Sequence, residues 1–216
     1  AVSLKVGRKT YAEELLFVFH LIFHPFDGFW DLKHEQRGSV RGGLTIMGIT
    51  ILAFFYQSIG QGYLFSGGYG SSYSGFWMQL LGVVVPLLLF VLANWCLTTL
   101  FDGEGSFRDI TIAVGYAIAP LPIFLIVSTL FSNIIVAEEA MIVSLLTTLG
   151  FVWCALLLFF GLMVTHDYSL KKNFVTILGT ILAMLIILFI AILFFSLIAK
   201  MITFVVSLIS EIGNRV

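Results

Sequence analysis

Five long apolar runs most constrain what this 216-residue chain can fold into. They cover residues 42–64, 76–101, 110–131, 141–165 and 174–209. A helix needs about 20 apolar residues to cross the hydrocarbon core of a bilayer, and every run is long enough. Only 11% of the residues are charged, against about 25% in a typical soluble domain. The pattern predicts an all-α polytopic membrane protein with five transmembrane helices, and it excludes a soluble enzyme.

Lysine and arginine are unequally distributed between the loops that would lie on the two sides of the membrane. Nine of the 11 lie in residues 1–41 or in the second and fourth loops, and the other two lie in the C-terminal tail. Because basic residues mark the cytoplasmic side, we expect a cytoplasmic N-terminus and an outer C-terminus. The net charge of −1 gives no basic patch for nucleic acid.

The fifth run is too long for a single span. At 1.5 Å per residue, residues 174–209 would form a helix about 54 Å long, whereas the hydrocarbon core is about 30 Å thick. Lys200 lies where a span should end, and polar residues share one helical face beyond it. We therefore divide the chain into an N-terminal segment (1–41), a membrane domain (42–200) and an amphipathic extension (201–216). The extension either lies in the interface, which we favour, or protrudes and packs against something.

The N-terminal segment combines an aromatic stripe with basic residues at four-residue steps. The expected membrane-binding residues are Phe19, Phe23, Phe26, Trp30, Lys33, Arg37 and Arg41. Aromatic side chains on one face of a helix are typical of a segment that lies in the headgroup plane, and the basic residues would meet anionic headgroups. Pro25 disfavours helix at His24, so a kink or two short helices are expected.

A polar stripe runs beside the aromatic one and has two interpretations. Its members are His20, His24, Asp27, Asp31 and His34. Histidine and aspartate at such spacings could bind a metal ion. The stripe contains neither cysteine nor a recognised zinc spacing, so we favour a solvated polar face and predict no metal.

Four short motifs occur in order along the chain. They are HPFDGFWDLKHEQRGSVRGGL (24–44), DGEGSFRDI (102–110), GYAIAP (115–120) and HDYS (166–169). Together they resemble the bacterial branch of the Yip domain family (Ypt-interacting-protein type) over about residues 12–200. The resemblance implies a five-helix domain with a cytosolic N-terminus, which in eukaryotes is tied to Rab-type GTPases and vesicle traffic.

The third run contains the residues that distinguish it from a plain spanning helix. Gly115 allows close approach of another helix, and Tyr116 needs a hydrogen-bond partner in the membrane, for which Asn94 is our first choice. Pro120 and Pro122 should kink or break the helix. Such a break is either a packing kink, which we favour, or the wall of a transport path.

Polar residues of the N-terminal segment and of two loops should share the cytoplasmic face. The predicted docking residues are Asp27, Asp31, Gly103, Glu104, Gly105, His166 and Asp167. We expect the acidic ones to pair across loops with Arg37, Arg41, Arg108, Lys171 and Lys172. The sequence contains no nucleophile motif, phosphate loop or zinc spacing, so we predict no catalytic residue and no cofactor.

These observations favour a non-enzymatic membrane adaptor, an accessory subunit of a transport or secretion assembly in the bacterial cytoplasmic membrane. Its expected partners are anionic lipid headgroups and other membrane proteins. The main alternative is a small-solute or ion transporter that uses the proline-kinked third span. A membrane enzyme with a metal at the cytoplasmic histidine and acid cluster is a more distant alternative.

Overall fold

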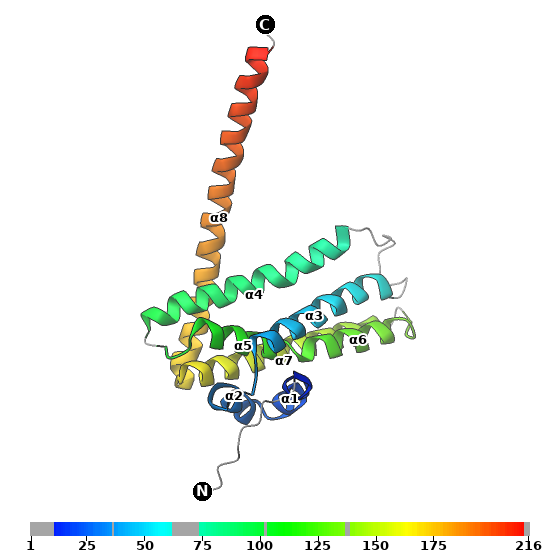
Figure 1. The fold of residues 1–216 in the computed structure, drawn as a ribbon. Helices are drawn as coiled ribbons and strands as arrows, with labels where there is room; N and C mark the ends of the chain where they lie inside the picture. The colour runs from blue at the N-terminus through cyan, green and yellow to red at the C-terminus, as the bar shows by residue number, and fades with distance from the viewer. Residues whose placement is uncertain (1–10, 36, 62–73, 102, 137–138, 214–216) are drawn as a thin grey trace.

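The described part of the chain is entirely helical. The computed structural model describes residues 11–35, 37–61, 74–101, 103–136 and 139–213, and these form eight helices without a strand. In chain order they are α1 (Tyr11–Phe23), α2 (Pro25–His34), α3 (Val40–Gly60), α4 (Ser74–Leu100), α5 (Phe107–Ala117), α6 (Pro120–Ser132), α7 (Ala140–His166) and α8 (Leu170–Gly213). In Figure 1, α3 to α7 form a bundle, α1 and α2 lie across one side of it, and α8 extends away.

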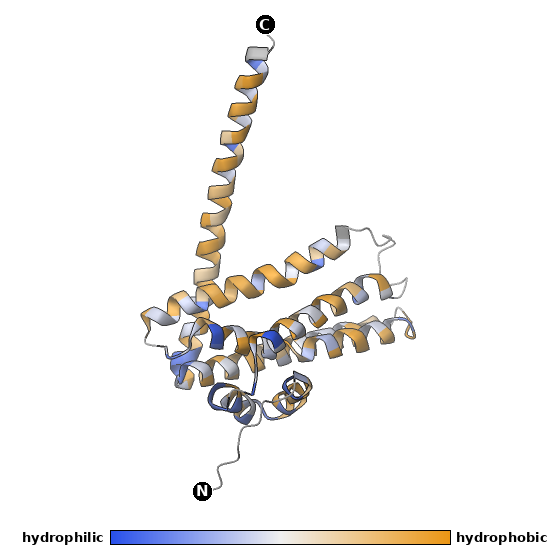
Figure 2. Cartoon of the chain, in the orientation of Figure 1, coloured by the Kyte–Doolittle hydropathy of each residue, from blue (hydrophilic) through white to orange (hydrophobic). Residues whose placement is uncertain are grey.

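The predicted number of membrane-spanning segments is confirmed. Helices α3, α4 and α7, the pair α5–α6, and α8 are each long and apolar enough to cross a membrane. Figure 2 shows the apolar residues along all of them, with hydrophilic residues concentrated at one end of the bundle and on α1 and α2. The predicted end of the first run, at residue 64, lies outside the described residues.

Close contact between two glycines joins the first span to the third. A Cβ atom added to Gly115 of α5 would lie 2.7 Å from the backbone Cα of Gly43 in α3. Further along the pair, the Asn133 side-chain amide donates to the Gly60 carbonyl over 2.7 Å. Contacts therefore advance in the same direction along both elements, so α3 runs parallel to α5–α6. Small residues let helix backbones approach in a membrane, where packing supplies much of the association energy.

The third span is broken at the prolines. Helix α5 ends at Ala117 and α6 begins at Pro120, because proline lacks the amide hydrogen that would continue the helix. The freed Tyr116 carbonyl accepts a hydrogen bond from the Ala119 amide over 3.2 Å. The carbonyl group that the break frees is thus hydrogen-bonded within the same segment. Pro120 and Pro122 are both buried in the bundle.

The N-terminal segment forms two short helices, separated as Pro25 requires. His24 precedes α2 with a non-helical φ of −130°, and Pro25 occupies the first turn of α2. Leu21 and Phe29 are buried against the bundle, and Phe29 packs on Gly161 of α7. Phe19, Phe23, Phe26 and Trp30 are all exposed. Their location in the headgroup layer stays a prediction.

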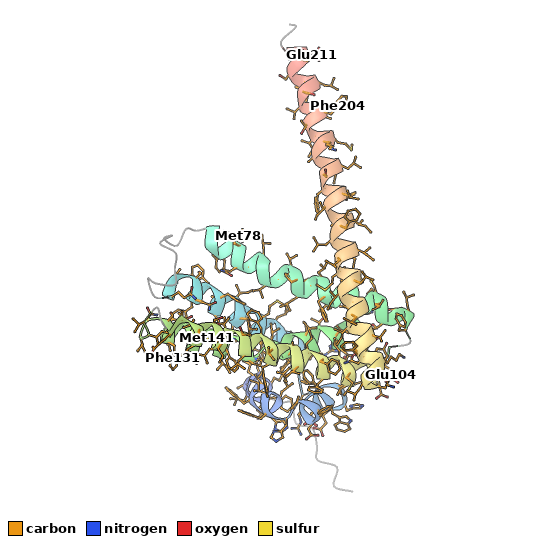
Figure 3. All side chains as sticks on the ribbon, turned by 180° about the vertical axis from the view of Figure 1, so that it is seen from behind. Met78, Glu104, Phe131, Met141, Phe204 and Glu211 are labelled. Atoms are coloured by element: carbon orange, nitrogen blue, oxygen red, sulfur yellow. The ribbon has the colours of Figure 1, made fainter. Side chains whose placement is uncertain are left out.

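Helix α8 continues without a break through Lys200. It has 44 residues, which corresponds to about 66 Å. Its first turns pack against α4, where Gly179 meets Leu97. Beyond Thr180, none of the described side chains of α8 is buried. Figures 1 and 3 show this part leaving the bundle, with Phe204 and Glu211 far from it, so in the structure residues 201–213 protrude.

Candidate functional site

One end of the bundle gathers nearly all the polar residues that the sequence indicated. We call it the polar end, and it consists of α1, α2 and residues 37–41, 103–108 and 167–172. Figure 3 shows Glu104 at this end and Phe131 and Met141 at the opposite end of the bundle. The two ends therefore differ in chemistry as well as in position.

A directional chain of hydrogen bonds lies beneath the polar end. The Gly105 amide donates to Nδ1 of His166 over 3.3 Å. Because that nitrogen accepts, the proton of the neutral ring is on Nε2, which donates to Oδ1 of Asn94 over 3.0 Å. The Asn94 amide in turn donates to Oγ1 of Thr180 over 3.0 Å. The chain joins a loop to α7, α4 and α8.

The loop with two glycines is shaped to fit the His166 ring. A Cβ at Gly105 would lie 2.7 Å from Cε1 of His166, and one at Gly103 would lie 2.6 Å from the Tyr168 hydroxyl oxygen. Tyr168 stacks on His166 with ring centroids 5.2 Å apart, and its hydroxyl donates to the Phe101 carbonyl over 3.1 Å. Larger residues at either glycine would push the loop off the rings.

The surface above this network is charged and hollowed. The Lys33 ammonium of α2 lies 3.2 Å from a Glu104 carboxylate oxygen, which ties α2 to the loop. Beside this ion pair is a cavity of about 270 Å³ whose lining includes Trp30, His34 and Asp167. Asp167 has a positive φ of 53°, which ends α7 sharply and begins the turn into α8.

Two of the basic residues predicted to meet lipid headgroups form ion pairs with carboxylates of the protein itself. Besides Lys33, the Arg37 guanidinium lies 2.6 Å from Glu35 and 3.4 Å from Asp31. Ion pairs this exposed contribute little to stability, but they do orient the side chains. Lys33 and Glu104 pair across segments, but Lys33 was not one of the expected basic partners. Of those expected, Arg37 pairs within its own segment, and the other four form no ion pair with a carboxylate in the described part of the chain.

Two predictions about individual residues are wrong. His166 was expected on an exposed docking surface, but its side chain is only 1% exposed, and it supports the surface from below. Tyr116 was expected to bond Asn94, but its hydroxyl donates to the backbone carbonyl of Glu14 in α1 over 3.3 Å. Asn94 is instead engaged with His166 and Thr180. Asp27 and Glu104 are exposed, and their docking role stays a prediction.

Sequence reasoning missed the part that α8 contributes. Asn173, Thr176 and Thr180 are buried polar residues in an otherwise apolar helix, and their spacing of three and four residues puts them on one face. That stripe was the available signal. In the described part of the chain, every buried side-chain nitrogen or oxygen has a hydrogen-bond partner.

The histidine and acidic residues of the polar end were also a candidate metal site. Within the described ranges, no group of three or more His, Cys, Asp and Glu residues is placed to hold a metal ion. In the polar stripe, the His20 and His24 rings stack with centroids 5.0 Å apart. What the polar end offers is a charged surface held by a well-connected buried network.

The fold and this site define an α-helical protein with five segments long and apolar enough to cross a membrane and one specialised polar end. Comparison with known families gives a more specific assignment: the Yip1 domain family matches residues 19–209, and the chain belongs to this family. This is a family of membrane proteins that is not known as enzymatic. No curated protein and no solved structure matches the chain.

Proposed function

We propose that the protein is a non-enzymatic membrane adaptor that docks other proteins through its polar end. The observation that carries this proposal is an exposed charged surface supported from below by a buried hydrogen-bond network. The Lys33–Glu104 pair and the cavity beside it lie directly over the buried His166 network. A surface held in one geometry binds a partner without first losing conformational entropy.

The distribution of polar groups supports docking over transport. An apolar cavity of about 460 Å³ lies beside the α5–α6 break and touches Ile118, Leu121 and Met184. The described residues that line it carry no charge. An ion path through a membrane normally uses charged side chains or rings of carbonyl groups. The cavity is therefore suited to apolar groups. This favours the interpretation of the α5–α6 break as a packing kink over its interpretation as the wall of a transport path.

In this proposal the polar end faces the cytoplasm of a bacterium. The basic residues of the N-terminal segment and of the second and fourth loops support that orientation. The exposed aromatic residues of α1 and α2 would lie in the headgroup layer beside the docking surface. The protein would serve as an accessory subunit of a transport or secretion assembly, with membrane proteins as its partners.

Photo-crosslinking tests the docking surface directly. We expect a photoreactive residue at His34 or Glu104 to form discrete adducts in native membranes, whereas one at Met141, at the opposite end, should form none. With the photoreactive residue at His34, Lys33→Glu should remove the adducts, because it replaces the ion pair with Glu104 by two like charges. Equal adducts at both ends would contradict docking through the polar end, and solute flux by the purified chain in proteoliposomes would favour the transporter.

Topology can be tested with single cysteines. In a variant with Cys96 and Cys154 replaced, we expect an impermeant thiol reagent to label a cysteine at Ile134 from outside intact cells. A cysteine at Ser169 should be labelled only after the membrane is permeabilised. Both positions are exposed, so access to the side chain is not limiting. Labelling of Ser169→Cys in intact cells would overturn the proposed orientation.

A further inference from the structure

A second cavity at the polar end has a different character from the one beside Glu104. It has a volume of about 500 Å³ and is lined by Tyr11, Glu14, Ser39, Val40, Arg41 and Arg108. These residues come from the first turn of α1 and the beginnings of α3 and α5. The docking proposal does not use this cavity.

Two arginines in this cavity are left without an acidic partner. In the described part of the chain, no carboxylate oxygen lies within ion-pair distance of Arg41 or Arg108, whereas Lys33 and Arg37 at the same end are paired. Both side chains are exposed. Guanidinium groups bind phosphate oxygens through paired, charge-assisted hydrogen bonds, so two of them in one cavity favour a phosphate-bearing ligand.

The acidic wall of the cavity is held in place. The Ser39 hydroxyl donates to Oε2 of Glu14 over 2.5 Å, and the Tyr116 hydroxyl donates to the Glu14 backbone carbonyl over 3.3 Å. The Tyr11 hydroxyl is hydrogen-bonded to Oγ1 of Thr45 in α3. Side chain and backbone of Glu14 are thus both fixed, which presents one carboxylate beside two guanidinium groups.

The position of the cavity along the spans indicates the source of the ligand. The segments long and apolar enough to cross a membrane begin at Val40 and Phe107, next to Arg41 and Arg108. Because α3 and α5 run parallel, both begin at this end, and the positive ends of their dipoles add to the charge of the arginines. A phosphate at the edge of the hydrocarbon core is most simply that of a phospholipid.

We propose that this cavity binds the headgroup of an aminophospholipid. The phosphate lies between Arg41 and Arg108, and the ammonium group lies at Glu14. Each charge of the headgroup then meets an opposite charge, since the phosphate lies between two guanidinium groups and the ammonium group lies at a carboxylate. The acyl chains extend along α3 and α5 into the bilayer. This site is independent of the docking surface and of any protein partner.

Native mass spectrometry of the purified full chain tests the site. The chain is incubated with phosphatidylethanolamine, phosphatidylglycerol or diacylglycerol, and bound lipid is measured. We expect phosphatidylethanolamine to bind best and diacylglycerol not to bind. Arg41→Gln and Arg108→Gln should each weaken phosphatidylethanolamine binding about tenfold, as expected for loss of a charge-assisted hydrogen bond. Lys171→Gln removes one positive charge from the same end and should leave binding unchanged.

Glu14→Gln tests the ammonium position separately. Its amide oxygen can still accept from Ser39, so the cavity wall is preserved while the negative charge is lost. The preference for phosphatidylethanolamine over phosphatidylglycerol should then disappear. The proposal is overturned if either arginine variant binds as well as the wild type, or if Lys171→Gln loses as much. Displacement of the lipid by millimolar inorganic phosphate would overturn the lipid assignment. None of these outcomes depends on a docking partner.

Discussion

Replacing Gly115 by leucine is expected to prevent assembly of the bundle. The added side chain would begin 2.7 Å from the Cα atom of Gly43, and that atom belongs to a helix backbone that cannot rotate away as a side chain would. Overpacking a core costs about 1–3 kcal/mol when side chains can adjust. Here α3 and α5 must separate, so we expect a loss above about 4 kcal/mol.

The two cysteines of the chain provide a probe for measuring the stability of the bundle. Cys154 is buried and Cys96 is exposed, so in a Cys96→Ser background a thiol-reactive dye reports unfolding of the bundle. The matched control is Gly48→Leu on α3, because an added Cβ there meets nothing within 4 Å. Gly43→Ala should also be tolerated, since its Cβ would lie 3.6 Å from the nearest atom. A Gly115→Leu protein that melts like the control would refute the close contact.

Replacing His166 by alanine is expected to loosen the whole polar end. The substitution leaves a cavity and removes the hydrogen-bond partners of the Gly105 amide and of Oδ1 of Asn94. A buried polar group without a partner costs about 1–3 kcal/mol, and the lost packing adds to this. We expect a total of about 3–5 kcal/mol, seen as a lower melting temperature in the dye assay.

Two comparisons distinguish loss of the His166 hydrogen-bond network from general destabilisation of the fold. His34→Ala removes an exposed histidine of the same end and should leave the melting temperature nearly unchanged. A double-mutant cycle of His166→Ala with Asn94→Ala should give a coupling energy of about 0.6–1.7 kcal/mol, the range for hydrogen bonds between membrane helices. Strictly additive losses would show that the two side chains do not act together.

The number of spans could be predicted because it follows from run length alone. The apolar runs are long enough and separated clearly enough that no tertiary contact is needed to count them. Breaks at Pro25 and Pro120 were also predictable, since proline acts on its own backbone. The continuous α8 was less obvious, because Lys200 resembles the end of a span, although a single lysine does not interrupt the hydrogen bonds of a helix.

The site was harder to predict because it depends on helix packing. His166 precedes the polar run DYSLKKN, which suggests an exposed loop, but in the fold its ring is buried and hydrogen-bonded to Asn94. Tyr116 and Asn94 both lie inside spans, and nothing in the sequence states which helix each one faces. Arg41 and Arg108 share a cavity only because α3 and α5 run parallel, a relationship between segments far apart in the chain.

Helix α8 packs against the bundle only along its first turns, and the rest of the helix projects away from the bundle. Its last buried side chain is Thr180, and Met184, one turn further on, still packs against the core. From Met184 to Glu211 the helix is about 40 Å long at 1.5 Å per residue. A tilt of about 10° where α8 leaves the bundle would displace Glu211 by about 7 Å. Thr180 lies near the point where α8 leaves the bundle. It is also the last residue in the series of hydrogen bonds that begins at Gly105. The displacement from any tilt of α8 that accompanied a rearrangement of this hydrogen-bond network would therefore be largest at Glu211.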